Sequence, residues 1–418
     1  MFDVDPAFDD GKLAEQAARL RRSLARQEQM RRSQLILNPV ENLPFRDDIA
    51  VAASLIHGLY NSDKVRSAEQ RLLADTLWAG RDDIASDCRT MYDLWAEALG
   101  AADATLRLRG GLNAHQVLLM SLKFAGMSVL LLPVRAGGHV SGQDIVDAID
   151  LETIEMVVDD EAMCVDIPAT LERCDRPPDL TIVDRSEGLV LEDLSQLASI
   201  ASTSVFDASQ CLTQILFGDH PHPFDAGYDL LLSTVHKNFP GPQKALIATR
   251  ERTDTWEGLV KGISTFVSNM DVAAIYAATF TLARTAWLRT YSARMLRCAT
   301  SLEAELADRG VPVVRRRADA TPTHHLWVQE GTREAAGGIM MALEACGFLV
   351  NYRTLPYSLG PGLRMGLSAA VRTGLDEGDI PELADLIATI RRAAPSPPEA
   401  LRCEAERFIR GIWERFEP

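Results

Sequence analysis

The sequence lacks the long apolar runs and the closely spaced cysteines that would suggest a membrane protein or a disulfide-bonded secreted one. No segment reaches the roughly 18 uncharged apolar residues that a membrane-spanning helix needs. Its seven cysteines are scattered, with no Cys-x-x-Cys pair and no Cys/His cluster, so neither a disulfide framework nor a structural zinc site is expected. The acidic start has no basic stretch followed by an apolar one, as a secretory signal would have. We therefore expect a cytoplasmic protein with no metal site.

Positive charge is also in short supply, because the 418 residues carry a formal net charge of -16. An acidic surface repels phosphate backbones and anionic lipids, so nucleic acids and membranes are poor partners. The apolar share of 47% is that of a globular protein, and the chain is long enough for two domains or one large core with a smaller lobe. Small molecules are the expected ligands.

Short apolar runs alternate with helical segments through the first two thirds of the chain. Near-continuous apolar runs are typical of strands buried on both faces, and their alternation with helices predicts a mainly parallel sheet covered by helices. A charged helix is expected over 12–33 and a helical block over about 67–100. The predicted strands are 128–133, 179–184, 202–209, 229–234 and 244–249.

The last third predicts a smaller α+β lobe. Residues 271–308 contain no proline or glycine and read as one long helical stretch. Strands and helices follow it: strands at 311–317, 324–329, 348–353 and 362–368, and helices near 333–345, 379–393 and 398–416.

Two charged residues stand where apolar runs end. Asp207 closes one predicted strand, and Lys237 follows the next one 30 residues later. In a pyridoxal phosphate enzyme, such an aspartate pairs with the ring nitrogen and such a lysine holds the aldehyde as a Schiff base. A free lysine is a poor nucleophile at neutral pH, so it would need desolvation or neighbouring cations. The alternative is that Asp207 caps a helix and Lys237 is solvated.

Two glycine pairs fit the same cofactor. Gly110-Gly111 enters a helix, and bare backbone amides there could bind a phosphate, although a plain tight turn would look the same. His139 follows the second pair, just past a strand, where an imidazole could stack on a planar ring or be an incidental polar residue.

Taken in order along the chain, six segments resemble serine hydroxymethyltransferase, a fold-type I pyridoxal phosphate enzyme. They are "RRSQLILNPVENLP", "AGGHVSG", "FDASQCLTQILFGDHPHPF", "STVHKNFPGPQ", "NYRTLPY" and "GLRMGLSAAVRTG". The resemblance implies an aspartate aminotransferase-like α/β fold, with a mainly parallel seven-stranded sheet in the large domain and a small α+β C-terminal domain. The implied division is an N-terminal helical arm over 1–55, a large cofactor-binding domain over 56–285, and a bridging helix with the small domain over 286–418.

The resemblance also implies residue roles. Lys237 would be the Schiff-base lysine, Asp207 the partner of the ring nitrogen, and His139 the stacking residue. Arg364 would bind the substrate carboxylate through its planar guanidinium fork. Glu41 and Tyr60 join Lys237 and His139 as catalytic candidates. Further cofactor contacts are expected from Gly110, Gly111, Ser186, Gln210, Thr234 and His236. Enzymes of this fold share active sites across a homodimer, so Tyr60 and Ser268-Asn269 would reach the neighbouring subunit; the alternative is that Tyr60 only packs in the core.

The departures from the family pattern fall on the folate side of the site. The segment that carries the family's acid/base glutamate is "LYNSDKVRSAEQ" here, where Tyr60 survives but Ser62, with Asp63 next to it, replaces the glutamate. The family's histidine after the Asp207 strand is Gln210, and the arginine of its lysine loop is Pro240. A pterin pocket needs shape and polar anchors, and several are gone.

The resemblance, together with these departures, implies an enzyme that makes or breaks the Cα–Cβ bond of a β-hydroxy-α-amino acid without folate, as in the family's folate-independent relatives. Cleavage of threonine or serine would leave a glycyl carbanion stabilised by the cofactor. Protonation of that carbanion is aldolase activity, and its attack on a second aldehyde is the transaldolase activity of specialised natural-product pathways. Candidate bases are His139, Glu41 and a water near Ser62. One alternative is a folate-dependent serine or α-methylserine hydroxymethyltransferase, and another is a catalytically weak scaffold subunit.

Overall fold

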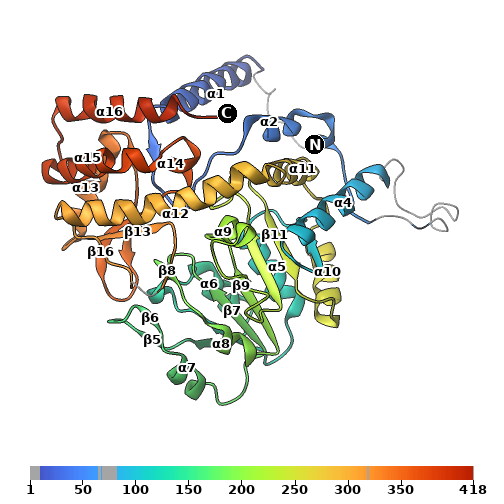
Figure 1. Ribbon diagram of the computed structural model, residues 1–418. Coiled ribbons are helices and arrows are strands. Elements are labelled where there is room, and N and C mark those ends of the chain that lie inside the picture. The colour runs from blue at the N-terminus through green and yellow to red at the C-terminus, as the bar shows by residue number, and fades with distance from the viewer. Residues whose placement is uncertain (1–9, 65–66, 68–81, 318–319, 418) are drawn as a thin grey trace, which may run out of the picture.

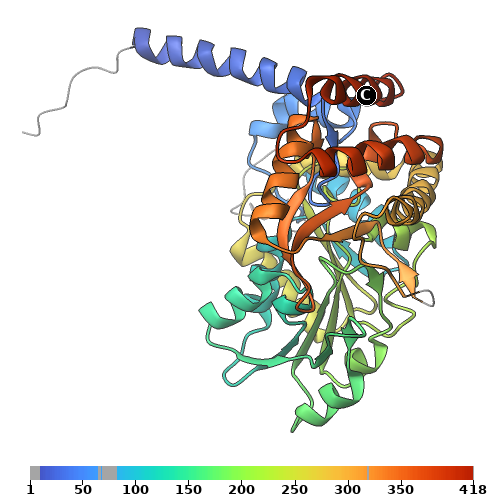
Figure 2. The same cartoon turned by 90° about the vertical axis from the view of Figure 1, so that its left-hand side faces the viewer.

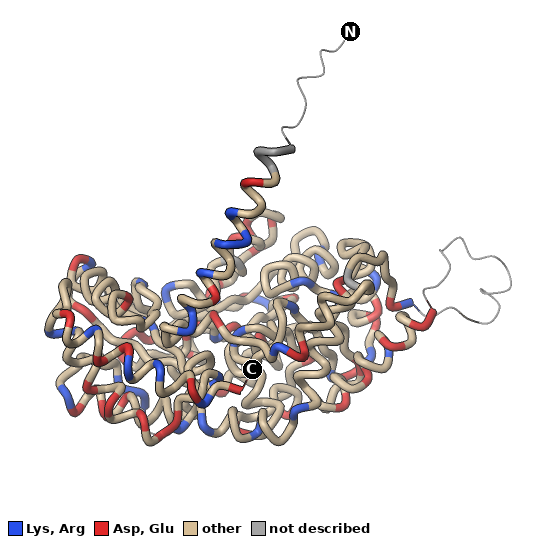
Figure 3. The backbone as a smooth tube through the Cα atoms, turned by 90° about the horizontal axis from the view of Figure 1, so that it is seen from above, with Lys and Arg blue, Asp and Glu red and all other residues tan. Residues whose placement is uncertain are grey.

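The N-terminal segment projects from the body and is anchored to the C-terminal part of the chain. The computed structural model describes residues 10–64, 67, 82–317 and 320–417. Helix α1 (Asp10–Arg31) extends away from the rest of the protein (Figures 2 and 3). Strand β1 (Leu35–Ile36), which follows it, pairs in parallel with β14 (Phe348–Leu349). The segment that follows α1 is thus joined to the C-terminal third of the chain.

A seven-stranded sheet forms the centre of the large domain, in the order β2-β11-β10-β9-β7-β3-β4. Strands β10, β9, β7, β3 and β4 pair in parallel, and β11 runs antiparallel to both β10 and β2. This confirms the predicted mainly parallel sheet of seven strands. Their bounds are β2 (Asp103–Thr105), β3 (Ser128–Leu131), β4 (Glu152–Glu155), β7 (Leu180–Asp184), β9 (Thr203–Asp207), β10 (Leu230–Thr234) and β11 (Ala245–Thr249).

Helices cover both faces of this sheet, as the continuous apolar runs require (Figure 1). Successive residues of a strand point to opposite faces, so Val205 joins one buried cluster and Phe206 the other. One face packs on α5 (Gly111–Leu122), α6 (Val140–Ala148) and α10 (Asp254–Phe266). The other is covered by α4 (Asp82–Ala98), α8 (Ser195–Ser199), α9 (Leu212–Phe217), α11 (Val272–Leu282) and α12 (Thr285–Asp308).

The predicted single helix over 271–308 is wrong, because α11 ends at Leu282 and α12 begins at Thr285. The break lies beside α2 (Arg46–Ile49), where Asp48 accepts two hydrogen bonds of 2.9 Å from the guanidinium of Arg284 and one of 2.9 Å from the hydroxyl of Thr281. A contact with a segment more than 230 residues away therefore interrupts a stretch that lacks any local helix breaker.

The C-terminal lobe has the α+β composition that was predicted, and it is built on a three-stranded antiparallel sheet. Its order is β13 (His325–Gln329), β16 (Gly360–Gly366), β15 (Asn351–Leu355). Helices α13 (Arg333–Ala345), α14 (Ser368–Arg372), α15 (Ile380–Ala393) and α16 (Glu399–Trp413) complete the lobe. The strand predicted over 311–317 is reduced to one bridge between Val313 and Val328. The domain boundaries at 55 and 285 stay predictions.

The smaller elements lie between these units. They are η1 (Ala50–Ala53), η2 (Leu55–Gly58), η3 (Val134–Ala136), β5 (Val158–Asp159), β6 (Cys164–Val165), α7 (Ile167–Arg173), β8 (Val190–Leu191), β12 (Thr321–Pro322) and η4 (Glu377–Asp379). The seven cysteines are free thiols. Among the described residues, no helix combines the length and the apolar character needed to cross a bilayer, and no three His, Cys, Asp or Glu side chains are grouped to hold a metal ion.

Candidate active site

Asp207 and Lys237 lie at the same edge of the large sheet. Asp207 is the last residue of β9, and Lys237 lies three residues beyond the end of its parallel neighbour β10. The carboxyl ends of parallel strands meet at one edge, which is where open α/β sheets bind their ligands. The two charges are close enough that Lys237 helps to lower the pKa of Asp207. The structure thus brings together the two residues on which the sequence prediction depends.

Asp207 is buried and held by two hydrogen bonds. Its Oδ2 lies 2.8 Å from Nε2 of His115, and its Oδ1 accepts a 2.8 Å bond from the backbone N–H of Ser209. Burial alone would raise the pKa of Asp207, but His115, Ser209 and Lys237 outweigh it and lower that pKa to about 2. Burial likewise works against a charged His115, yet the bond to Asp207 prevails and raises the pKa of the imidazole. An aspartate kept ionised in this way suits a partner for a protonated ring nitrogen.

The His115–Asp207 pair predicts a bell-shaped pH dependence of stability. In the cofactor-free protein, we expect His115→Gln to lower the free energy of unfolding by about 2 kcal/mol near pH 5. The lowered pKa of Asp207 stabilises the folded state fully above about pH 3.8, its ordinary pKa, and this stabilisation is lost as the pH falls toward about 2. The raised pKa of His115 contributes below its ordinary value of 6.5 and is lost as pH rises through the folded value. Urea unfolding at several pH values measures the difference, and a difference independent of pH would contradict it.

The backbone of Lys237 is held by Asn42, which belongs to the segment that resembles the N-terminal motif of the family. Nδ2 of Asn42 donates to the carbonyl of Lys237 at 2.6 Å and to the hydroxyl of Tyr291 at 3.0 Å. Asn238, the residue after the lysine, is buried, and its Oδ1 accepts the backbone N–H of Thr213 at 2.8 Å. The lysine side chain itself is half-buried and has no hydrogen bond or ion pair with any residue in the described ranges. The anchored backbone therefore holds in place a lysine whose side chain is not engaged by any described residue.

The start of α5 forms a small cradle beside β10. Gly110 caps the helix and Gly111 is its first residue. A Cβ on Gly111 would lie only 2.9 Å from Cγ2 of Thr234, so the close approach requires glycine. The hydroxyl of Thr234 is buried and has no partner within the described part of the chain. Helix-start amides and an unused hydroxyl are what a phosphate group would bind, so these residues fit the phosphate of pyridoxal phosphate.

His139 and Ser186 approach the same edge through Asp184, the last residue of β7. One carboxylate oxygen of Asp184 accepts the backbone N–H of His139 at 3.0 Å, and the other accepts the Ser186 hydroxyl at 2.5 Å. Desolvation lowers the pKa of His139, and Asp184 offsets this only in part; Lys237 and Asp207 also act on that pKa. The His139 ring thus lies within electrostatic range of Lys237 and Asp207, and its lowered pKa favours the neutral imidazole at pH 7.

Arg364 and Gln210 come from different elements and are both linked to β13, which pairs with β16 and carries His325. Arg364 on β16 is buried, and its Nη1 lies 3.1 Å from Oε1 of Glu187 and 3.4 Å from the carbonyl of Ser186. The Oε1 of Gln210 lies 3.3 Å from Nε2 of both His324 and His325. If these two imidazoles donate, they occupy the amide oxygen of Gln210.

Three of the predicted residues make their contacts elsewhere. The carboxylate of Glu41 accepts a 3.1 Å bond from Asn38 and lies 3.8 Å from Arg31. Tyr60 is 52% exposed, and its hydroxyl donates to the carbonyl of Ser268 at 3.2 Å, so core packing does not explain it. His236 has Nδ1 3.3 Å from the Lys244 carbonyl, and burial lowers its pKa to about 4. Whether these residues act in catalysis stays a prediction.

Sequence reasoning missed His115 and Glu187. His115 lies four residues after Gly111, on the same face of α5, so helical spacing could have placed it next to the cradle. Glu187 follows Ser186 directly, but its partners Arg353 and Arg364 lie more than 160 residues away, and no local pattern links them.

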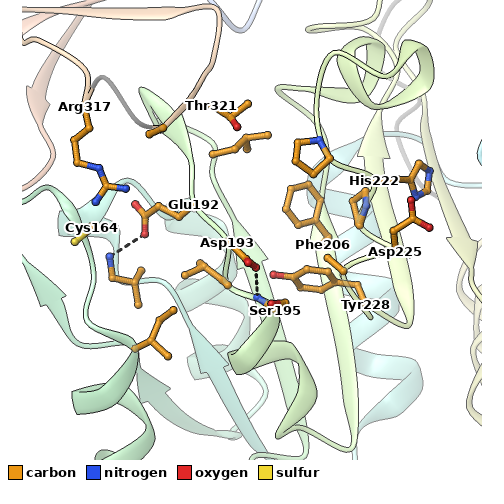
Figure 4. Close-up of a pocket in the computed structure, with 18 residues that line it drawn as sticks. Cys164, Glu192, Asp193, Ser195, Phe206, His222, Asp225, Tyr228, Arg317 and Thr321 are labelled. Carbon is orange, nitrogen blue, oxygen red and sulfur yellow. Dashed lines mark hydrogen bonds between the residues drawn. The ribbon is translucent and has the colours of Figure 1, made fainter.

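A separate cavity of about 920 Å³ opens beside β8 and α8 (Figure 4). Its charged and polar lining includes Cys164, Glu192, Asp193, His222, Asp225 and Arg317. Phe206 lines it, whereas its neighbour Asp207 points to the other face of the sheet. None of the predicted site residues lines this cavity, so it is distinct from the candidate active site.

Comparison with known proteins supports the cofactor assignment. No protein-family model matches the chain. A serine hydroxymethyltransferase of Pyrobaculum calidifontis is 30% identical over 333 residues, which is 77% of each chain. A fluorothreonine transaldolase of Streptantibioticus cattleyicolor is 30% identical over 349 residues, covering 82% of this chain and 54% of the relative. A crystal structure of L-threonine transaldolase from Pseudomonas fluorescens, in its internal aldimine state, has a TM-score of 0.87 at 21% identity, over 96% of this chain and 93% of that one.

The structural match shows the fold, and the sequence matches show the family. The fold is the fold-type I architecture that the resemblance implied. Lys237, Asp207, the α5 cradle and the unused Thr234 hydroxyl fit the cofactor of that family. The chain is therefore a member of the serine hydroxymethyltransferase family of pyridoxal phosphate-dependent enzymes.

Proposed function

We propose that this enzyme makes or breaks the Cα–Cβ bond of a β-hydroxy-α-amino acid, without folate, as a threonine aldolase or transaldolase of specialised metabolism. Bound pyridoxal phosphate supplies an electron sink for the charge that develops at Cα when this bond breaks. The chain's own residues position the reactants: Lys237 holds the cofactor, ionised Asp207 keeps its ring protonated, and Arg364 binds the amino acid carboxylate.

The observation that supports folate independence is that the side chains of Ser62 and Asp63 are engaged in contacts within the chain. By resemblance, this segment should offer a free glutamate for acid/base work beside folate. Instead, the Ser62 hydroxyl accepts the backbone N–H of Lys64 at 3.2 Å. Asp63 is tied to Arg107 at 2.7 Å and to the hydroxyl of Tyr92 at 3.2 Å. We therefore infer that the neighbouring carboxylate does not replace the missing glutamate, because Arg107 and Tyr92 hold its two oxygens in place.

Proton transfer from the β-hydroxyl group then requires another base. His139 is the best candidate, because its lowered pKa favours a neutral imidazole that can accept a proton, and Lys237 and Asp207 lie close enough to act on that pKa. The fluorothreonine and threonine transaldolases among the similar proteins support the same reading by their names. The competing proposal, a folate-dependent hydroxymethyltransferase, is supported by the Pyrobaculum relative.

The two proposals differ in one measurement. We expect the holoenzyme to release acetaldehyde from L-threonine at the same rate, within about twofold, with and without tetrahydrofolate, since no folate-side acid is needed. Adding a second aldehyde such as benzaldehyde should yield a new β-hydroxy-α-amino acid, detected by mass spectrometry. Cleavage only in the presence of tetrahydrofolate would favour the hydroxymethyltransferase. The Lys237→Ala variant is the blank for both assays.

We further propose a cytoplasmic homodimer with shared active sites. Tyr60 and Asn61 contact Ser268 and Asn269 in the same chain, which joins the two segments that the family places at the subunit boundary. Light scattering of the holoenzyme tests the dimer.

A further inference from the structure

Glu187 is a buried carboxylate seated between two arginines at the predicted substrate-binding position. It follows β7, and only 7% of its side chain is exposed. Its Oε1 lies 3.1 Å from Nη1 of Arg364 on β16 and forms a direct ion pair with Arg353 on the neighbouring strand β15. Gly137 leaves room for it, because a Cβ there would lie 3.3 Å from that of Glu187. The arginine expected to bind the amino acid therefore already has a carboxylate partner.

The two arginines differ in freedom. Arg364 has 3% of its side chain exposed, and its Nε is buried without a partner among the described residues. Arg353 has 36% exposed, so it can move with Glu187 while Arg364 stays in place. Burial raises the pKa of Glu187, and the two arginines offset this only in part, so its charge is poorly accommodated where it lies. A second carboxylate arriving at Arg364 would repel it further.

We propose that Glu187 is a specificity-determining residue: a resident carboxylate that the substrate carboxylate displaces from Arg364 and that Arg353 retains. This inference rests on the proposed role of Arg364 in amino acid binding. In the resting enzyme, Glu187 neutralises Arg364 and keeps inorganic anions off it. Only a ligand that is also held through its amino group gains enough to replace Glu187.

The test is the affinity of the holoenzyme for glycine, measured by isothermal titration calorimetry. Glu187→Gln keeps the size of the side chain and removes the charge, so glycine should bind about tenfold more tightly. Arg353→Gln removes the retaining partner and leaves Glu187 wholly on Arg364, so glycine should bind about tenfold more weakly. Acetate and sulfate, which lack the amino group, should bind Glu187→Gln and barely bind the wild type.

A matched control lies five residues along the chain. Glu192 and Arg185 form another buried ion pair, with 2.7 Å between Oε1 and Nη2. Glu192→Gln should lower the melting temperature as Glu187→Gln does, yet leave glycine affinity unchanged. This separates the loss of a buried ion pair from the loss of a competing carboxylate.

The proposal predicts that the two variants change glycine affinity in opposite directions. If Glu187→Gln and Arg353→Gln both weaken glycine binding, Glu187 only holds Arg364 in place and the proposal is wrong. If Glu187→Gln does not fold, the half-exposed Arg353→Gln still gives the answer, because tighter or unchanged binding overturns the proposal. Acetate binding does not depend on the reaction that the enzyme catalyses. If acetate binds Glu187→Gln more tightly than the wild type but the wild type does not cleave threonine, the proposed function is wrong and the inference about Glu187 stands.

Discussion

The Lys237→Ala protein is expected to lose the visible absorbance of lysine-bound pyridoxal phosphate and to lose about 10⁴-fold or more in kcat. The loss is large because the side chain proposed to form the covalent bond is gone. The fold should survive, since the Lys237 backbone is held by Asn42 and its side chain makes no hydrogen bond or ion pair within the described residues. Absorbance spectra and threonine cleavage measure the effect.

The experiment also tests whether Lys244, rather than Lys237, binds the cofactor. Lys244 is fully buried, burial lowers its pKa to about 8, and its Nζ donates to the carbonyl of Arg107 at 3.5 Å. A lysine with a lowered pKa is itself a candidate nucleophile. If the absorbance band persists in Lys237→Ala, the assignment passes to Lys244. Lys261→Ala, at an exposed position of α10, is the control and should keep both the band and the activity.

The Asp207→Asn protein should keep the visible band but lose about 10²- to 10³-fold in kcat, the size of effect seen when one preorganised electrostatic group is removed. An amide has no charge with which to keep the cofactor ring protonated, so charge at Cα is stabilised less. His115 loses its partner as well, and burial then favours its neutral form. Single-turnover cleavage of threonine, followed by rapid quench, separates this loss of chemistry from slow product release.

His115→Gln is the companion to Asp207→Asn. Because His115 acts through Asp207, its replacement should cost less activity, and the double variant should be no worse than Asp207→Asn alone. Independent, additive losses in the double variant would show that His115 has a separate role. Full activity in Asp207→Asn would place the partner of the ring nitrogen elsewhere.

The contacts of Asp63 with Arg107 and Tyr92 bear on the departures from the family pattern around Ser62. Substitution of the family glutamate by Ser62 left open whether the adjacent aspartate takes over. Its ion pair with Arg107 and its bond to Tyr92 give it a structural task between α4 and the segment after β2. Arg107 also donates to the carbonyl of Val267 at 2.7 Å, so Asp63 and Arg107 connect this segment to the one before α11. These contacts support the proposal that the enzyme works without folate.

The sequence by itself determined the sheet and the place of the reactive pair. Apolar runs such as 229–234 are typical of strands buried on both faces, and the carboxyl ends of parallel neighbours lie at the same edge of a sheet. The pattern therefore favoured a place for Asp207 and Lys237 close together, which the pairing of β9 with β10 provides. Arg364 came from resemblance alone, since nothing in its local pattern distinguishes it from other arginines.

Only the tertiary structure decided which charges meet. The break between α11 and α12 depends on Asp48, the ionised state of Asp207 depends on His115, and the neutralisation of Arg364 depends on Glu187. Each of these pairs joins segments more than 90 residues apart in the chain. Local patterning of apolar residues sets strands and helices, because burial acts on every residue in turn. Electrostatic pairing acts over a few ångströms, so it becomes visible only when the folded chain has fixed those distances.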